Sequence, residues 1–300
     1  MNELKFFQKG PEGNLNTVEL WSSIRIPFEP KGEIKDLQDS LSNSIKKIRT
    51  SADSILYASY IADHSEYCDV ENVLLYNIGT GTFKNLCQYG LCFEKKIGFP
   101  PKNPKFLEYA PHYYSYKVAD LNNPFEFWKK GKTLFSWSNI NSPAFKSNTK
   151  LDSYWYALKT GKFDMTGMND RFDAFGLDLR INVPSGTKIN VAAVIKPLLD
   201  GIVSVFHVHD GSDINFLSKC IADRTGKGQR NIVDLLVDPK LAILGKRNLL
   251  HRWGDSIQWN PADDLCLAVK VLVNDSLERD KWQFSGDLFT ISPRIENELR

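Results

Sequence analysis

Two acidic side chains stand two positions apart where a short apolar helix is expected to begin. Asp69 and Glu71 precede an apolar stretch that runs to Ile78, and Gly79 follows as a helix terminator. Acids at positions i and i+2 of a helix opening can both face one cleft. The same residues also suit a structural role, with Asp69 capping the helix and Glu71 complementing its dipole. The sequence leaves both interpretations open.

Two histidines, His207 and His209, lie on one side of an extended segment that ends in Asp210. Histidines at this spacing can hold a metal ion, although no third histidine is near in the sequence. Hydrogen bonds to neighbouring groups are the simpler interpretation of the pair. This segment is nevertheless the preferred place for chemistry in the second half of the chain.

Basic residues gather in the second half around a glycine-containing stretch, residues 224–231, which we expect to be a flexible loop. Lysine and arginine interleaved with glycine and followed by Trp253 suit contacts to a phosphate backbone. A solvated loop would have the same composition. The candidate nucleic-acid-binding residues are Arg224, Lys227, Arg230, Lys246, Arg247 and Arg252.

Several familiar catalytic motifs are absent or incomplete. Residues 130–133 (KGKT) resemble the end of a phosphate-binding loop, but Glu126 occupies the position of its first glycine. No G-x-S-x-G, H-E-x-x-H or G-x-G-x-x-G motif is present, so we expect no nucleotide or organic cofactor. Residues 94–96 (EKK), which follow Asp69, match the D…ExK arrangement of restriction-type nucleases, a pattern that arises readily by chance.

The composition is that of an ordinary folded protein. With 42% hydrophobic and 25% charged residues, the 300-residue chain is long enough to bury a core without disulfides or metal ions. A net charge of +2 excludes the strongly basic field of histone-like proteins. The five cysteines form no CxxC pair, and no apolar segment has the length of a signal or membrane span. We therefore expect a soluble, cytoplasmic protein with no membrane partner.

Hydrophobic periodicity predicts alternating strands and helices, and hence an α+β protein with mixed sheets. Strands are expected over residues 18–28, 55–62, 90–97, 153–158, 175–183 and 265–273, and helices over 34–49, 69–78, 190–206 and 217–221. Prolines and aromatic residues set residues 99–150 apart as an irregular connecting segment with one or two strands. The predicted parts are an N-terminal half, 1–98, this segment, and a C-terminal half, 151–300.

The two halves show a possible internal repeat. An offset of 121 positions, from 69 to 190, places residues 56–78 on residues 177–199 without a gap. Both segments consist of a strand, a polar loop and a helix. Identities are few and such units are common, so a duplication and an unrelated recurrence are both open.

The first half resembles RusA-type Holliday-junction resolvases, in which a strand is followed by a helix opening D-x-D-N-x-x-K and then by further aspartates. Asp69, Glu71 and Asn72 match the acidic part of this motif. Leu75 stands where the family has its lysine.

The second half matches the motif at other positions. Lys196 and Asp200 correspond to it, and Asp210 follows ten residues later, whereas Asn190 and Ala192 replace both leading acids. Each half therefore retains what the other lacks. The resemblance covers roughly 35 residues in each half.

The resemblance implies a nuclease site, because acidic residues of this family hold divalent metal for phosphodiester cleavage. Such chemistry needs carboxylates that converge on cations about 4 Å apart. If the halves form an intramolecular pseudo-dimer, the implied catalytic residues are Asp69, Glu71, Lys196 and Asp210, with Asp69, Glu71 and Asp210 as ligands of Mg²⁺.

The sequence therefore supports three hypotheses about function. The leading hypothesis is a nucleic-acid-associated protein with two RusA-like halves, a subunit of a bacterial DNA-processing or phage-defence complex that contacts DNA or RNA and protein partners. The second is a divalent-metal-dependent endonuclease. The third is a non-catalytic interaction scaffold whose aromatic middle segment is the docking surface.

Overall fold

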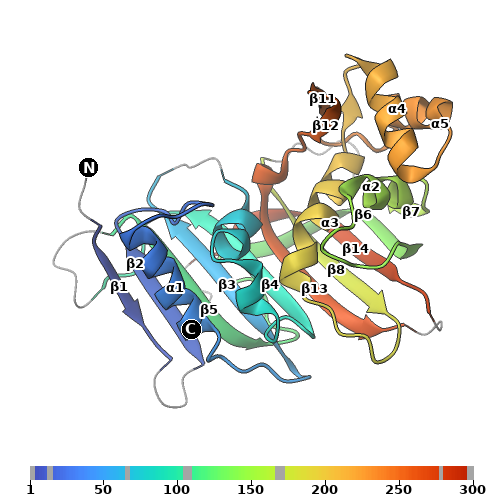
Figure 1. The fold of residues 1–300 in the computed structure, drawn as a ribbon. Helices are drawn as coiled ribbons and strands as arrows, with labels where there is room; N and C mark the ends of the chain where they lie inside the picture. The colour runs from blue at the N-terminus through green and yellow to red at the C-terminus, as the bar shows by residue number, and fades with distance from the viewer. Residues whose placement is uncertain are drawn as a thin grey trace.

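One large mixed sheet organises the molecule (Figure 1). The computed structural model describes residues 4–11, 16–64, 68–103, 110–165, 173–276 and 280–295. Ten strands follow the order β1-β2-β5-β3-β4-β13-β8-β14-β6-β7, and the helices lie mainly on one face of this sheet. The predicted α+β class is thus confirmed.

The N-terminal half supplies one side of the sheet. Its elements are β1 (Phe6–Lys9), β2 (Thr17–Ser22), α1 (Glu33–Ile45), β3 (Ser54–Ala62), the π-helical turn η1 (Asn72–Tyr76), the 3-10 turn η2 (Thr80–Phe83), β4 (Gly90–Ile97) and β5 (His112–Asp120). All nine residues of β3 are buried, as expected of a central strand with packing on both faces.

The C-terminal half supplies the other side. Its elements are β6 (Trp128–Asn141), α2 (Leu151–Lys159), β7 (Phe163–Met165), β8 (Phe175–Val183), α3 (Val191–Val205), β13 (Cys266–Asp275) and β14 (Gln283–Pro293). Helix α3 packs its apolar residues into the main core, which fixes the orientation of its polar face.

A segment that has no counterpart in the N-terminal half separates α3 from β13. It contains β9 (Val208–His209), α4 (Ile214–Thr225), α5 (Gln229–Val237), η3 (Pro239–Leu241), β10 (Lys246–Arg247), β11 (Leu250–Trp253), β12 (Ser256–Trp259) and η4 (Asp263–Leu265). In Figure 1, α4, α5, β11 and β12 project above one end of the sheet. We call residues 206–265 the insertion.

The two halves share their element order and strand directions. Along the chain, the series β2-α1-β3-η1-β4-β5 of the N-terminal half is matched by β6-α2-β8-α3-β13-β14 of the C-terminal half. In the sheet, the corresponding strand orders are β2-β5-β3-β4 and β6-β14-β8-β13. In each, the third strand runs parallel to the fourth and antiparallel to the second. The halves meet where β4 pairs antiparallel with β13, with Cys92 opposite Lys270.

The strand register follows the 121-residue offset. Strands β3 and β8 begin at residues 54 and 175 and end at residues 62 and 183, so both ends differ by 121. Leu91 and Val269 each precede the central Cys92–Lys270 pair by one position, and their partners in β3 and β8 are Leu56 and Leu177. These partners also differ by 121. The register is the one that a two-fold axis through the central pair would produce.

Two sequence-based assignments in the C-terminal half are wrong. Residues 153–158 form part of α2 instead of a strand, because Tyr154, Trp155 and Leu158 bury one helical face. Residues 224–231 are not one flexible loop: α4 ends at Thr225 and α5 begins at Gln229, so only three residues connect them. Helix α5 packs apolar side chains against the core, which accounts for its formation. The sequence does not predict this helix, because its apolar pattern is short.

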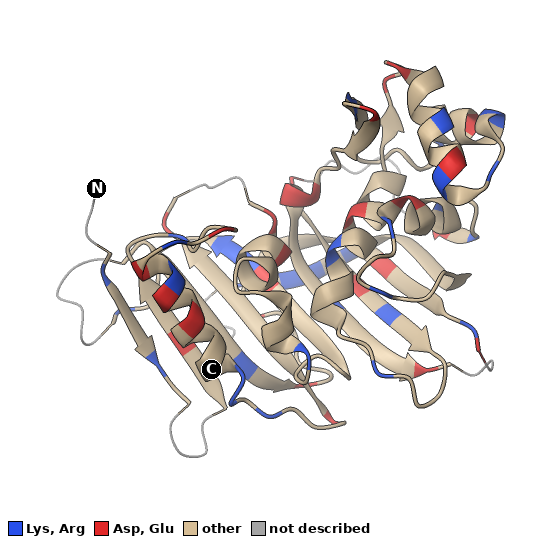
Figure 2. Ribbon diagram, viewed as in Figure 1, with Lys and Arg blue, Asp and Glu red and all other residues tan. Residues whose placement is uncertain are grey.

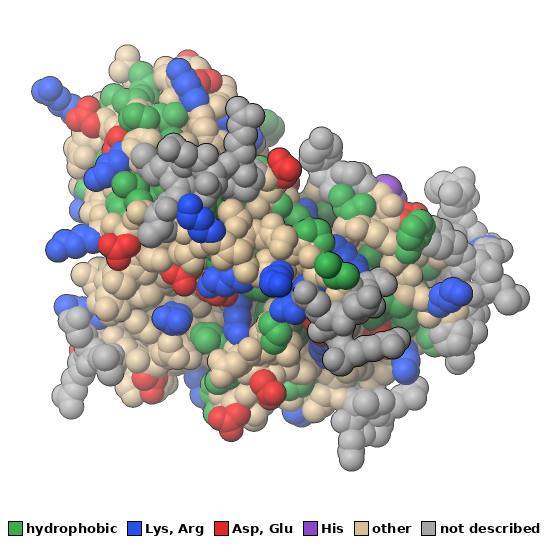
Figure 3. All heavy atoms as spheres, turned by 180° about the vertical axis from the view of Figure 1, so that it is seen from behind, with side chains coloured by type: hydrophobic (Ala, Val, Ile, Leu, Met, Phe, Trp, Pro, Cys, Tyr) green, Lys and Arg blue, Asp and Glu red, His purple; other side chains and the backbone are tan. Residues whose placement is uncertain are grey.

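The middle segment 99–150 is not a purely irregular connection, although its residues 104–109 lie outside the described residues. It contributes β5 to the first half of the sheet and β6 to the second. On the face opposite the helices, basic side chains lie across the middle of the surface (Figure 3). Within the described ranges, no helix combines the length and apolar character needed to traverse a bilayer.

Candidate functional site

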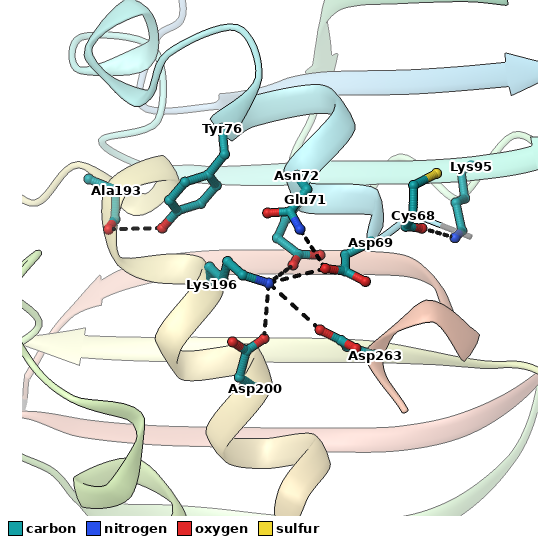
Figure 4. Close-up of polar contacts among 10 residues, drawn as sticks. All are labelled: Cys68, Asp69, Glu71, Asn72, Tyr76, Lys95, Ala193, Lys196, Asp200 and Asp263. Atoms are coloured by element: carbon teal, nitrogen blue, oxygen red, sulfur yellow. Dashed lines mark hydrogen bonds and ion pairs between the residues drawn. The ribbon is translucent and has the colours of Figure 1, made fainter. Parts of the chain in front are cut away.

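Three segments that are distant in sequence bring five charged side chains together (Figure 4). Asp69 and Glu71 lie just before η1 in the N-terminal half. Lys196 and Asp200 lie one turn apart on α3, and Asp263 begins η4 directly before β13. We call these five residues the carboxylate–lysine cluster. It lies where the two halves of the molecule meet.

The ammonium of Lys196 is at the centre of the cluster. Its Nζ lies 2.9 Å from Glu71 Oε1 and 3.2 Å from Asp69 Oδ2. The carboxylate oxygens of Asp200 and Asp263 are 3.5 Å and 3.7 Å away. Four carboxylates therefore surround one cation, so the cluster carries an excess of negative charge when all of them are ionised.

The backbone conformation around residues 69–77 places Asp69 and Glu71 beside the Lys196 ammonium. The expected helix at residues 69–78 is a π-helical turn, in which the Asn77 amide donates to the Asn72 carbonyl over 2.8 Å. Such turns are rare in proteins, and those that occur are often found at functional sites. The side-chain amide of Asn72 donates to Asp69. The N-cap position of this turn belongs to Glu71, whose side chain makes no capping hydrogen bond, and not to Asp69.

Burial makes the cluster electrostatically unusual. The Glu71 side chain is only 2% exposed, and burial raises its pKa against the opposing effect of Lys196. Burial also raises the pKa values of Asp200 and Asp263. For Lys196, burial alone would lower the pKa, but Glu71, Asp200 and Asp69 raise it above its ordinary value. The ammonium is therefore fully protonated near neutral pH.

Three of the acids have the geometry of a metal site. One oxygen each from Asp69, Glu71 and Asp263 lies within 4.8 Å of the other two. Carboxylate oxygens are the ligands that Mg²⁺ and Ca²⁺ prefer, so the donor set fits a hard divalent cation. An ion bound here would lie beside the ammonium that pairs with the same carboxylates.

The cluster opens into a cleft of about 660 Å³. Besides the three aspartates of the cluster and Lys196, its walls include Lys150, Arg224 and Trp259, whereas Glu71 is buried and does not line the cleft. The buried carboxylate of Asp152 positions two of these side chains: Arg224 Nη1 lies 3.3 Å from it, and Trp259 Nε1 donates to it over 2.7 Å. Charged and aromatic groups thus line the approach to the acids.

Asp210 lies apart from the cluster. Its carboxylate accepts hydrogen bonds from the backbone amide and hydroxyl of Ser212, which lower its pKa. Its neighbours are His209 and Lys246, in the insertion. Asp263, instead of Asp210, is the third acid beside Asp69 and Glu71.

The two histidines have local partners. His207 Nε2 accepts from the Ala262 amide over 3.2 Å, and its Nδ1 lies 3.3 Å from the Gly245 carbonyl oxygen. His209 Nε2 lies 2.7 Å from the Ser212 carbonyl oxygen. Both side chains are buried, and burial lowers the pKa of His207 to about 4. These contacts match the simpler interpretation of the pair.

The six candidate nucleic-acid-binding residues are distributed over the insertion. Arg224 alone among them lines the cleft. Lys227 lies over the Tyr156 ring, Arg252 lies over the Phe216 ring, and Arg230 is exposed on α5. Lys246 and Arg247 form β10. Figure 2 shows acidic residues interspersed with basic ones over α4 and α5, so this region is not a uniform basic patch.

Glu94 and Lys95 point to opposite faces of β4. Glu94 is buried and accepts hydrogen bonds from the Tyr57 hydroxyl and from the backbone amides of Glu126 and Phe127. Lys95 donates to the Cys68 carbonyl, on the side of the cluster. The D…ExK pattern therefore does not assemble one site here. Residues 130–133 lie within β6, so they form no phosphate-binding loop.

Asp263 is the member of the cluster that sequence reasoning missed. An acidic pair, Asp263-Asp264, directly precedes the apolar strand β13 and was a usable signal. The insertion separates this pair from α3, which obscured its relation to Asp200.

Comparisons with known proteins add no relative. No family model, no curated protein and no solved structure matches the chain.

Proposed function

We propose that the protein is a divalent-cation-dependent phosphodiesterase that acts on nucleic acid and resembles the RusA-type resolvases. The observation that carries the proposal is the convergence of Asp69, the buried Glu71 and Asp263 beside Lys196, next to a cleft that Asp69, Asp263 and Lys196 line. Three separate segments supply these groups, two of them from the C-terminal half. The proposal treats the two halves as a covalently joined pseudo-dimer.

The residues of the cleft suit this reaction. A bound divalent cation would supply a water of lowered pKa and neutralise charge on the phosphate. Lys196 holds a second positive charge beside the carboxylates, where it can stabilise charge that develops on a phosphate oxygen. Arg224 and Lys150 can bind flanking phosphates, and Trp259 offers a ring on which an unpaired base can stack.

Hydrolysis of plasmid and branched DNA in Mg²⁺ or Mn²⁺ tests the proposal. Glu71→Gln and Asp263→Asn should each lower the rate by roughly two orders of magnitude or more, because each removes a charge that the reaction requires. Asp234→Asn, an exposed acid on α5, is the matched control and should retain activity. Asp210→Asn separates the two assignments of the third acid, and the proposal expects it to cleave normally.

A second candidate is nucleic-acid binding without hydrolysis. Lys196 already pairs with the carboxylates, an arrangement that can be purely structural. This candidate predicts salt-dependent DNA binding, with no cleavage in either metal and no effect of Glu71→Gln on affinity. Failure to bind any DNA or RNA would leave the interaction scaffold.

A further inference from the structure

The shared register of the two halves defines a second position equivalent to the carboxylate–lysine cluster. The cluster combines the turn opening of the N-terminal half with the helix face of the C-terminal half. At the second position, which the 121-residue offset defines, the two halves exchange these contributions. The turn opening then comes from the start of α3, and the helix face comes from η1 and the residues after it.

The five equivalent positions carry no charge. The offset relates Asp69 and Glu71 to Asn190 and Ala192, and Lys196 and Asp200 to Leu75 and Gly79. Asp263 lies five positions before Ala268 of β13, which corresponds to Gly90 of β4, so its counterpart is Asn85.

The segments that carry four of these counterparts contact each other across the junction of the halves. The side-chain amide of Asn190 donates to the Thr80 carbonyl over 3.0 Å, which joins the start of α3 to the N-terminal half. The Tyr76 hydroxyl lies 3.3 Å from the Ala193 carbonyl oxygen across the same junction. Leu75 and Ala192 are completely buried. The second position is thus uncharged, and two of its five residues are completely buried.

A position without a carboxylate lacks the ligands that a hard divalent cation prefers, and none of these five residues supplies one. We infer that the described residues form a single hydrolytic site and that the protein cuts one strand of a duplex per binding event, so that its product is a nick. This inference rests on the proposed function. The second position then takes no part in cleavage.

The order in which products appear from supercoiled plasmid tests the inference. With protein at a concentration where light scattering shows monomers, open circles should accumulate first, and linear DNA should appear only after a lag. A duplex labelled on one strand or the other should be cut once per molecule in a single turnover. Linear plasmid that forms without a nicked intermediate would overturn the single-site inference and leave the proposed function standing.

Two variants test whether the reaction takes place at the carboxylate–lysine cluster and not at the second position. Glu71→Gln should lower the rate of nicking by roughly two orders of magnitude or more and abolish the binding of Mn²⁺ measured by electron paramagnetic resonance. Asn190→Ser, on the opposite side, should leave nicking and Mn²⁺ binding intact. Nicking by Glu71→Gln at the wild-type rate, or lost cleavage in a folded Asn190→Ser protein, would place reactive groups at the second position and overturn the inference. If the wild-type protein cleaves nothing, the proposed function itself fails.

Discussion

Replacing Lys196 by methionine tests whether the ammonium holds the cluster together. Lys196→Met keeps an apolar side chain of similar length but leaves Glu71, Asp69, Asp200 and Asp263 without their shared cation. Because Glu71 is almost completely buried, its charge then has neither solvent nor a partner. We expect a less stable protein.

The size of the effect follows from burial. Removing one partner of a buried ion pair costs about 3–5 kcal/mol. The Lys196 side chain is 27% exposed and the three aspartates are 17–22% exposed, so water offsets part of the loss. We therefore expect the free energy of unfolding to fall by about 2–4 kcal/mol near pH 7.5.

The pH dependence of this deficit has a definite sign. Without the ammonium, the carboxyl pKa values in the folded protein rise further above those of the unfolded chain. The folded variant then binds more protons than the unfolded chain, so its stability is lost as pH rises through the folded pKa values. The deficit relative to wild type should shrink as the pH falls toward 5.

Urea unfolding followed by tryptophan fluorescence between pH 5 and 8 measures this deficit. Lys219→Met on α4, which replaces an exposed lysine, is the matched control and should change little. Mg²⁺ at a hundred times its dissociation constant should restore about 2.7 kcal/mol, if it binds only the folded state. A Lys196→Met protein as stable as wild type at every pH would refute the electrostatic reasoning.

Glu94→Gln should remove a pH-dependent loss of stability. Burial raises the pKa of Glu94 from 4.5 to about 7, so the wild type loses up to about 3 kcal/mol as pH rises through this range, and parallel stability curves for the two proteins would contradict this. His207 has the opposite sign: burial lowers its pKa from 6.5 to about 4, so up to about 3 kcal/mol is lost as pH falls through this range. His207→Gln should flatten that part of the curve, and an unchanged slope would be evidence against it. Gly201→Ala should lower the free energy of unfolding by about 1–3 kcal/mol despite the better helix propensity of alanine. Its Cβ would lie 2.9 Å from Tyr154 Cβ and 3.0 Å from the Leu151 carbonyl oxygen, and a raised melting temperature would show that α2 and α3 tolerate it.

The sequence alone determined the central elements of both halves. Apolar runs predicted β3, β4 and β8 almost to the residue, and helical spacing predicted α3. These elements are predictable because burial on one or both faces imposes a period of two or 3.6 residues on the sequence. The 121-residue offset was also visible, and it matches both ends of β3 and β8.

Only the tertiary structure decided which charged residues meet. Asp69, Glu71 and Lys196 were all nominated from the sequence, but their contact depends on how β4 pairs with β13, which no local pattern encodes. The path of the insertion decides that Asp263 joins them and that Asp210 does not. Strands place successive side chains on opposite faces, and a residue distant in sequence can complete a site only where the sheet register returns the chain to it. Spacing along the chain therefore identified the acids near η1, whereas the fold selected their partners.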